Sequence, residues 1–314
     1  MTDILLPDPS GISRAAALLQ QGALVALPTE TVYGLGADAR NGTAVAGIYT
    51  AKGRPSFNPL IIHVADVDQA RQYGRWSDTA EVLASAFWPG PMTLVLPLAE
   101  RHGLSSLVTA GLDSIAIRIP AHPTARAILR AFGGPVAAPS ANPSGKISAT
   151  TAQHVLSGLQ GRIAAVVDDG PCTVGLESTI IRLNQPRPTL LRAGGLPSEA
   201  IEAALGGTLD VADGAEIIAP GQLASHYAPH ASVRLNAHDA KEDEVYLGFG
   251  AAKGTGADDL TLSASGDLVE AAAQLFDQLH ALDRLRKPIA VAPIPETGLG
   301  RAINDRLRRA AAPR

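Results

Sequence analysis

Apolar positions in the first two hundred residues follow two spacings, one typical of helices and one typical of buried strands. Residues 12–21 repeat apolar side chains every three to four positions, which predicts an amphipathic helix ending before Gly22. Residues 23–28 (ALVALP) form an apolar run that stops at a proline, as buried strands do. The same criteria predict helices at 43–52, 78–87, 122–132 and 150–160, and strands at 60–64, 92–97, 114–120, 135–138, 164–168, 176–183 and 189–193. This alternation indicates an α/β fold, and the short spacings between strands favour a twisted mixed sheet.

The pattern changes after Ala204. Residues 206–230 contain glycines and prolines with few periodic apolar positions, which predicts a long connection. Periodicity returns with strands at 244–250 and 288–293 and helices at 267–285 and 300–311. We therefore expect a larger domain over 1–205, a linker over 206–230, and a smaller α/β, Rossmann-like domain over 231–314.

Composition and charge limit the classes of function. With 46% hydrophobic and 18% charged residues, the chain is expected to fold around a sizeable core. The net charge of −4 argues against a protein held on nucleic acid or a membrane by bulk charge. Residues 1–205 carry 15 basic and 15 acidic side chains, so the excess acid lies in residues 206–314. An anionic ligand is therefore expected on the first domain.

The sequence also predicts a soluble, cytoplasmic protein. No apolar run is long enough to span a membrane, and the first ten residues lack the basic and apolar regions of a secretory signal. The single cysteine, Cys172, excludes an intramolecular disulfide and a multi-cysteine zinc site, and is expected to be a packing residue. The eight histidines have no metal-ligand spacing, so we expect no protein-bound metal site.

The sequence contains neither a GxxxxGK[ST] loop nor a GxGxxG turn, so side chains must supply most of any phosphate contacts. The isolated Gly34-Leu35-Gly36 predicts no more than a tight turn. Lys52 and Arg54, held between glycine and proline and followed by Asn58, form a rigid basic corner that suits a polyphosphate. The loop at 138–148 (APSANPSGKIS) adds three hydroxyls, an amide and a lysine after a predicted strand.

Other polar groups stand at the ends of predicted strands, where open α/β sheets place their ligands. Arg118 interrupts an apolar strand, and because burying an unpaired charge is costly, it needs an anionic ligand or a carboxylate partner. The segment 28–34 (PTETVYG) supplies two hydroxyls, a carboxylate and a phenol. His63 lies within a strand, where a single histidine is more often a core residue than a catalyst.

Taken together, these segments resemble the YrdC-like family, in the long form of the threonylcarbamoyl-AMP synthases that carry an extra C-terminal domain. The resemblance covers nearly the whole chain and rests on ordered blocks: PTETVYGLG (28–36), KGRP (52–55), NPLIIHV (58–64), WPGPMTLVL (88–96), SIAIRIPAHP (114–123), APSANPSGKIS (138–148), GLESTII (175–181), LRAGG (191–195), PGQLASHYAPHA (220–231) and PETGLGRAINDRLRRAA (295–311).

The resemblance implies a reaction and a set of site residues. The family condenses L-threonine, bicarbonate or carbon dioxide, and ATP with Mg2+, and other proteins transfer the threonylcarbamoyl group to tRNA next to the anticodon. The residues that it implies on the threonine side are Thr31, His63, Arg118, Ala138 and Ser178. Those that it implies on the ATP side are Lys52, Arg54, Asn58, Ser114, Ser140, Asn142, Ser148, Arg192 and Tyr227.

The linker is expected to act as a lid. It carries the pair His226-Tyr227, and a free spacer would need no large aromatic residue. The resemblance implies that Tyr227 folds back over the nucleotide. The run 222–225 (QLAS) is less basic than in long-form relatives, which leaves a phosphate contact from that run in doubt but not the lid.

Two alternative functions stay open. The first is an RNA-binding module, which the net-neutral first domain and the 4% aromatic content disfavour. The second is a carbamoyl-transfer relative of hydrogenase maturation factors, which would need zinc-finger parts that one cysteine cannot supply.

Overall fold

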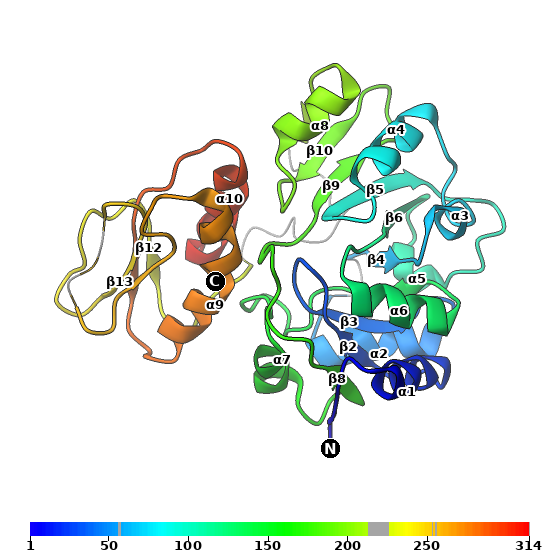
Figure 1. Cartoon of the computed structure of the whole chain (residues 1–314), viewed down its shortest axis with the longest axis horizontal. Helices are drawn as coiled ribbons and strands as arrows, with labels where there is room; N and C mark the ends of the chain where they lie inside the picture. The colour runs from blue at the N-terminus through cyan, green and yellow to red at the C-terminus, as the bar shows by residue number, and fades with distance from the viewer. Residues whose placement is uncertain (56–57, 213–225, 253, 255, 314) are drawn as a thin grey trace.

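The computed structural model describes residues 1–55, 58–212, 226–252, 254 and 256–313. Within these residues the chain forms an eleven-stranded mixed sheet with flanking helices and a separate four-stranded parallel sheet (Figure 1). This arrangement confirms the predicted α/β class and the mixed first sheet. No helix within the described residues is long and apolar enough to cross a bilayer.

The first part of the chain contains most of the elements. Its strands are β1 (Asp3–Leu5), β2 (Val25–Leu27), β3 (Gly34–Asp38), β4 (Ile61–His63), β5 (Met92–Pro97), β6 (Ser114–Arg118), β7 (Val136–Ala137), β8 (Ala165–Val167), β9 (Thr179–Arg182), β10 (Thr189–Arg192) and β11 (Asp210–Val211). Its helices are α1 (Pro9–Gln20), α2 (Gly42–Lys52), α3 (Val67–Ala70), α4 (Asp78–Phe87), α5 (Ser106–Thr109), α6 (Pro123–Phe132), α7 (Ala152–Leu159) and α8 (Ser198–Leu205).

The strand order of the first sheet is β1-β8-β2-β3-β7-β4-β6-β5-β9-β10-β11. β4 and β6 are parallel, with His63 paired to Arg118, so both strands end at the same edge. β7 is antiparallel to β4, and the backbone N–H of Ala138 donates to the Ile61 carbonyl at 3.0 Å. β9 is parallel to β5, with Thr179 paired to Met92. These pairings bring the segments that follow β4 and β6 close to the segment that precedes β9, whereas the segment that follows β7 lies next to the start of β4.

Helix ends place the basic corner that the sequence predicts. The side chain of Asn41 caps the start of α2 by accepting from the backbone N–H groups of Thr43 and Ala44. The helix ends at Gly53, whose φ of 61° lies in the left-handed region that glycine tolerates best. Lys52 is therefore the last helical residue, and the chain turns sharply before Arg54.

The second part of the chain packs its helices toward the first. Its elements are β12 (Val233–Arg234), β13 (Val245–Gly248), β14 (Leu260–Thr261), α9 (Leu268–Asp283), β15 (Ile289–Val291) and α10 (Leu299–Ala311). In Figure 1, α9 and α10 lie between the strands of this part and the first domain. Their core continues into the first domain through Val32, Ile147 and Leu176. Gly175 sits so close to α9 that a Cβ there would lie 2.4 Å from the Ala272 carbonyl oxygen.

Two expectations need correction. The glycines of Gly34-Leu35-Gly36 do not form a tight turn; they lie in β3, which is antiparallel to β2 and β7. Glycine is needed there for close packing, since a Cβ on Gly36 would lie 3.0 Å from Val136 Cγ1. The first sheet also continues past residue 205, because β11 pairs in parallel with β10. The buried position of Cys172 agrees with the packing role expected of it.

Candidate active site

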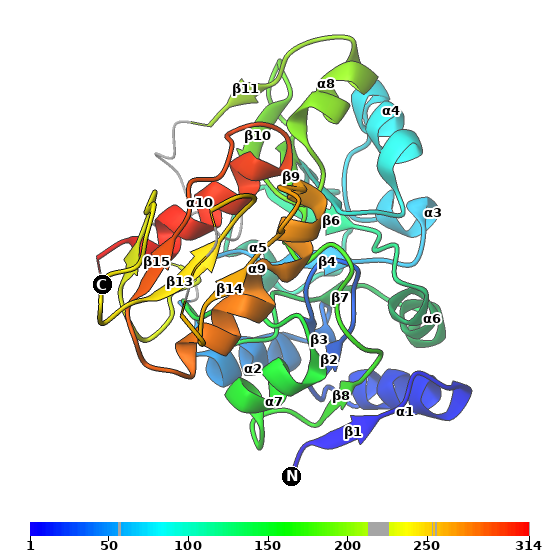
Figure 2. The ribbon, with the colours of Figure 1, turned by 60° about the vertical axis from the view of Figure 1, so that its left-hand side comes forward.

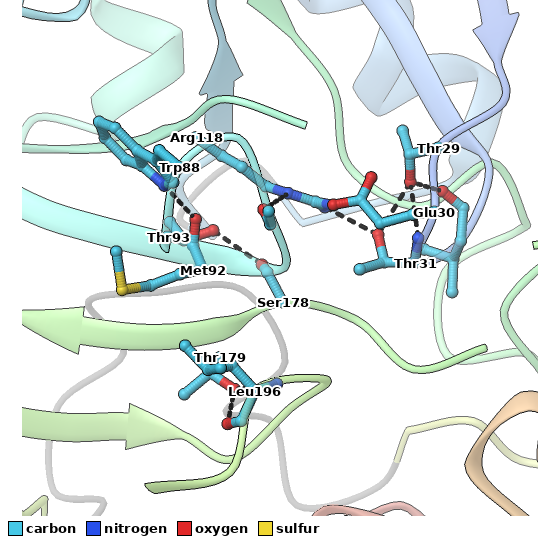
Figure 3. A network of polar contacts seen from close by, with 12 residues as sticks. Thr29, Glu30, Thr31, Trp88, Met92, Thr93, Arg118, Ser178, Thr179 and Leu196 are labelled. Atoms are coloured by element: carbon cyan, nitrogen blue, oxygen red, sulfur yellow. Dashed lines mark hydrogen bonds and ion pairs between the residues drawn. The ribbon is translucent and has the colours of Figure 1, made fainter. Parts of the chain in front are cut away.

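The edge where β4 and β6 end carries a buried polar network around Arg118 (Figure 3). The guanidinium donates from Nη2 to Glu30 Oε1 at 2.6 Å, from Nη1 to Thr31 Oγ1 at 2.7 Å, and from Nε to the Gly90 carbonyl at 3.2 Å. Glu30 is thus the carboxylate partner that a buried arginine requires. Because a guanidinium has five N–H donors, one N–H on each terminal nitrogen is left over to bind another anion.

Two titratable groups beside Arg118 have strongly shifted pKa values. Burial opposes the ionisation of Glu30, but the charge and hydrogen bond of Arg118 outweigh it and hold the pKa of this carboxyl below its ordinary value. Burial, helped by the nearby Arg118, lowers the pKa of His63 to about 3. The imidazole is therefore neutral at physiological pH and can accept a hydrogen bond from a cationic group.

Ser178 lines the same cavity as Arg118 and is bound by a second arginine. Its hydroxyl lies 2.7 Å from Thr93 Oγ1 (Figure 3). Arg192 Nη2 donates to the Ser178 hydroxyl at 3.2 Å and to its carbonyl at 2.9 Å. A small polar molecule held by Arg118 would consequently lie next to a group already bound to Arg192.

Two more buried cations, Lys52 and Arg54, also bind backbone carbonyls. Lys52 Nζ donates to the carbonyls of Ser140 and Asn142, both at 2.5 Å. Arg54 Nη2 donates to the Pro59 carbonyl at 3.0 Å, and its guanidinium also reaches the Asn58 carbonyl. Carbonyl oxygens satisfy the donors of Lys52 and Arg54 without supplying a counter-charge, so this part of the site favours an anion.

The pKa values of these cations reflect their burial. Burial, and then the charge of Arg54, holds the pKa of Lys52 well below its ordinary value. Burial lowers the pKa of Arg54 to about 10, and the nearby Arg192 contributes to the shift. A bound anion would reverse these shifts, so this cluster of cations has the properties of an anion site.

Ser148, Glu177 and Tyr227 complete the wall of the site. The Ser148 hydroxyl donates to Glu177 Oε1 at 2.5 Å, and Glu177 Oε2 accepts from Arg306 of α10 at 2.9 Å. Tyr227 is 1% exposed, packs against Phe276 of α9 with ring centroids 5.5 Å apart, and has a positive φ of 60°. A tyrosine in the left-handed region is strained, and such strain is common at functional sites.

These groups enclose a cavity of about 50 Å³. Sites for small molecules commonly measure about 300–1,000 Å³, so substrates could enter only if part of the wall moved. Nine of the residues expected on the two sides of the site line it, namely Thr31, Arg54, His63, Arg118, Ala138, Ser140, Ser178, Arg192 and Tyr227. Most of the expected set therefore converges, although it comes from segments spread over almost two hundred residues.

The other five expected residues lie outside the cavity lining. Lys52 and Asn58 stand behind it, in contact with Ser140 and Arg54 respectively. Ser148 reaches it through Glu177. Asn142 lines a different cavity of about 710 Å³, between α7 and α9. Ser114 is at the start of β6, roughly 13 Å along the strand from Arg118.

Sequence reasoning assigned no role to Glu30, Glu177 or Arg306. Glu30 and Glu177 lie inside the motifs at 28–36 and 175–181. Their position next to the expected site residues is the signal that could have identified them. Arg306 lies at helical spacing from the apolar residues Ile303 and Ala310 of α10. This spacing is the signal that could have predicted a buried arginine. Of the linker, residues 213–225 lie outside the described residues. His226 and Tyr227 line the cavity, and the lid stays a prediction.

The described residues contain no cluster of three or more His, Cys, Asp or Glu side chains that could hold a metal ion. The two carboxylates nearest the cavity are each bound by an arginine, Glu30 by Arg118 and Glu177 by Arg306. The donor set of this site therefore suits an anion.

Comparison with known proteins identifies the family of the chain. A family model described as "Telomere recombination" matches residues 17–194, and one described as "Threonylcarbamoyl-AMP synthase, C-terminal domain" matches residues 196–312. The chain is 42% identical to the threonylcarbamoyl-AMP synthase of Bacillus subtilis, over 100% of this chain and 96% of that protein. It is 41% identical to the enzyme of the same name from Pyrococcus abyssi, over 95% of this chain and 93% of that protein.

Solved structures agree with this result. The crystal structure of Pyrococcus abyssi Sua5 complexed with L-threonine covers 99% of this chain and 97% of its own, with a TM-score of 0.91 and 37% identity. Escherichia coli YciO, at 20% identity and a TM-score of 0.55 over 62% of this chain and 95% of its own, shares the fold of the first domain. The chain therefore belongs to the threonylcarbamoyl-AMP synthase family, in the form that carries the additional C-terminal domain.

Proposed function

We propose that this protein makes L-threonylcarbamoyl-AMP from L-threonine, bicarbonate or carbon dioxide, and ATP, and releases pyrophosphate. One observation carries the proposal: Lys52 and Arg54 are buried and bind backbone carbonyls rather than carboxylates, so a triphosphate would supply the counter-charge that suits them. The relatives that bear this enzyme name match the chain over nearly its whole length.

Threonine would occupy the Arg118 side of the site. The two remaining N–H groups of Arg118 suit the substrate carboxylate, and the hydroxyls of Thr31 and Ser178 suit its polar groups. Neutral His63 could accept from the α-amine, and Ala138 would line the pocket through its backbone. The threonine complex of the Pyrococcus abyssi relative supports this ligand.

ATP would occupy the cationic side. Lys52, Arg54 and Asn58 are assigned to the phosphates. The remaining assigned ATP contacts are Ser114, Ser140, Asn142, Ser148, Arg192 and Tyr227. Since the nearby carboxylates are engaged by arginines, Mg2+ would arrive with ATP as its phosphate complex, and the protein's residues would bind that complex through its anionic oxygens.

The chemistry asks the chain for positioning and charge neutralisation. The threonine amine attacks the carbon of carbon dioxide, or of bicarbonate with loss of water, and gives a carbamate. A carbamate oxygen then attacks the α-phosphorus of ATP, and the bond to the bridging oxygen of pyrophosphate breaks. Arg118 would hold the amino acid in place while the cations around Lys52 stabilise the negative charge on the phosphates.

The linker would close over this labile product. His226 and Tyr227 line the cavity, so their withdrawal would open it to substrates and their return would exclude water. The product would supply other cytoplasmic proteins that transfer the threonylcarbamoyl group to tRNA next to the anticodon. Direct tRNA contact is not needed for this proposal.

The test is a pyrophosphate-release assay with labelled bicarbonate. We expect pyrophosphate and a labelled adenylate that both require threonine, bicarbonate and ATP together. Pyrophosphate release that continues without threonine would contradict the proposal. Tight binding of RNA without any such release would instead favour the RNA-binding alternative, and release supported by carbamoyl phosphate in place of threonine would favour the carbamoyl-transfer alternative.

A further inference from the structure

The buried charge of Arg306 is the feature of the C-terminal domain that its own fold does not explain. Its side chain is 0% exposed although it lies among the apolar positions of α10, which buries Ile303, Leu307 and Ala310 on the same face. Burying a guanidinium is costly, so the position is expected to hold an apolar residue unless the charge is used.

Most of the partners of Arg306 belong to the other domain. Its Nε donates to Glu177 Oε2 at 2.9 Å and its Nη1 to the Ala193 carbonyl at 2.8 Å, both in the first domain. Within its own domain it binds Asp305, which is partly exposed. Its Cζ atom also lies 5.3 Å from the centre of the Tyr227 ring. Arg306 therefore joins α10 to the wall of the candidate site. Figure 2 shows α10 beside α9, the helix whose Phe276 packs on Tyr227.

The contacts continue from Glu177 to Ser148. Glu177 Oε1 accepts from the Ser148 hydroxyl at 2.5 Å, while the Ser148 carbonyl lies 3.1 Å from His280 Nε2 of α9. The side chain of Ser148 is thus held by Glu177, which Arg306 of α10 binds in turn. The backbone of Ser148 is held by His280 of α9, in the same domain as α10. Both helices of the C-terminal domain act on one residue assigned to ATP.

Charge makes this chain of contacts selective between the two substrates. With Arg306 in place, the carboxylate of Glu177 is held in an ion pair. Without it, Arg192 would be the remaining arginine acting on Glu177, and a buried carboxylate that has lost its ion-pair partner would line the cavity. That charge would repel the triphosphate of ATP far more than threonine, which carries one positive and one negative charge and no net charge.

We propose that Arg306 is a positioning residue for the nucleotide: it neutralises Glu177, holds Ser148 through it, and supports the ring of Tyr227. This inference rests on the proposed function for the identity of the nucleotide. It gives the C-terminal domain a direct part in the ATP half of the site.

The test uses full-length variants and measures ligand binding by calorimetry, with ATP and threonine each titrated alone. Arg306→Met removes the charge and keeps most of the volume. We expect it to weaken ATP binding about tenfold or more and to change threonine binding less than about threefold. In the Glu177→Gln background, where no carboxylate is left unpaired, the same substitution should change ATP binding less than about threefold.

Arg308→Met is the matched control, since Arg308 is an exposed arginine of the same helix paired with Glu296 at 2.6 Å, and it should leave both affinities unchanged. If Arg306→Met does not fold, Arg306→Lys, which keeps the charge and loses the forked geometry, should still weaken ATP binding selectively. Equal loss of both ligands, or an equal effect in both Glu177 backgrounds, would overturn the proposal. Because ATP binding is read without threonine or bicarbonate, absence of threonine-dependent pyrophosphate release would count against the proposed function alone.

Discussion

Replacement of Arg118 by methionine should destabilise the first domain through Glu30. Arg118 is 4% exposed and Glu30 is 7% exposed, and the two form an ion pair of 2.6 Å. Methionine fills most of the space but leaves the carboxylate buried without its counter-charge. Breaking a buried pair in this way costs about 3–5 kcal/mol, whereas removing both charges is often nearly neutral.

The cost can be measured as a shift in melting temperature. For a cooperative unit of 150–250 residues, 1 kcal/mol lowers Tm by about 2–4 °C, so Arg118→Met should lower Tm by about 6–20 °C. The double variant Arg118→Met with Glu30→Gln should recover most of that loss. Differential scanning calorimetry of the single and double variants at pH 7.5 provides the measurement.

The loss should also depend on pH. In the native protein Arg118 holds the pKa of Glu30 below its ordinary value, so the pair contributes stability above the unfolded pKa and loses it as pH falls through the folded pKa. In Arg118→Met burial would raise that pKa, so the penalty disappears once the carboxyl is protonated. The Tm gap to the native protein should widen from pH 4.5 to pH 7.5. A gap below about 2 °C at pH 7.5, or one independent of pH, would refute this reasoning.

Further predictions concern the nucleotide side and the linker. ATP binding should raise the lowered pKa of Lys52, so calorimetry in two buffers of different ionisation enthalpy, repeated from pH 7 to pH 10, should detect proton uptake that Lys52→Arg abolishes. Equal uptake by both proteins at every pH would contradict the assignment. Arg54→Ala should weaken ATP binding about tenfold and leave threonine binding measurable, as titrations of each ligand would report. Tyr227→Ala should speed hydrolysis or release of the intermediate, and ATP with threonine should protect residues 219–230 from limited proteolysis; unchanged cleavage argues for a plain tether. Gly53→Ala should cost about 1 kcal/mol in chemical denaturation, because its φ of 61° disfavours a Cβ although space is available.

The elements that sequence reasoning placed correctly are those with a strong periodic pattern. The predictions at 78–87 and 92–97 coincide with α4 and β5, since helix spacing and a long apolar run are visible there. β3 could not be predicted because its glycines disfavour a strand. Gly36 is needed there because β3 packs closely against Val136 of β7, a contact between distant segments that no local pattern shows. β12 and β14 are two residues long, too short for any periodicity to be seen.

Nine of the fourteen residues expected at the site line the cavity, but the pairs that they form could not be predicted from the sequence. The need of Arg118 for an anionic partner followed from an arginine in an apolar strand, and Glu30 confirms it. The choice of Glu30 depends on a contact across 88 residues, which only the folded sheet brings about. Arg306 lies on the apolar face of α10. Its role in the site could not be predicted, because its partner Glu177 belongs to the first domain.

The pairing of Arg306 with Glu177 has a consequence for the order of events on the ribosome. The two residues are 129 positions apart, and at about 5–20 residues per second the second appears on the order of ten seconds after the first. During that interval a nascent first domain can form its sheet while Glu177 still lacks its guanidinium. If Arg306 positions the nucleotide as we propose, such an unfinished chain would present an unpaired carboxylate to the phosphates and would consume little ATP until the later helix is in place.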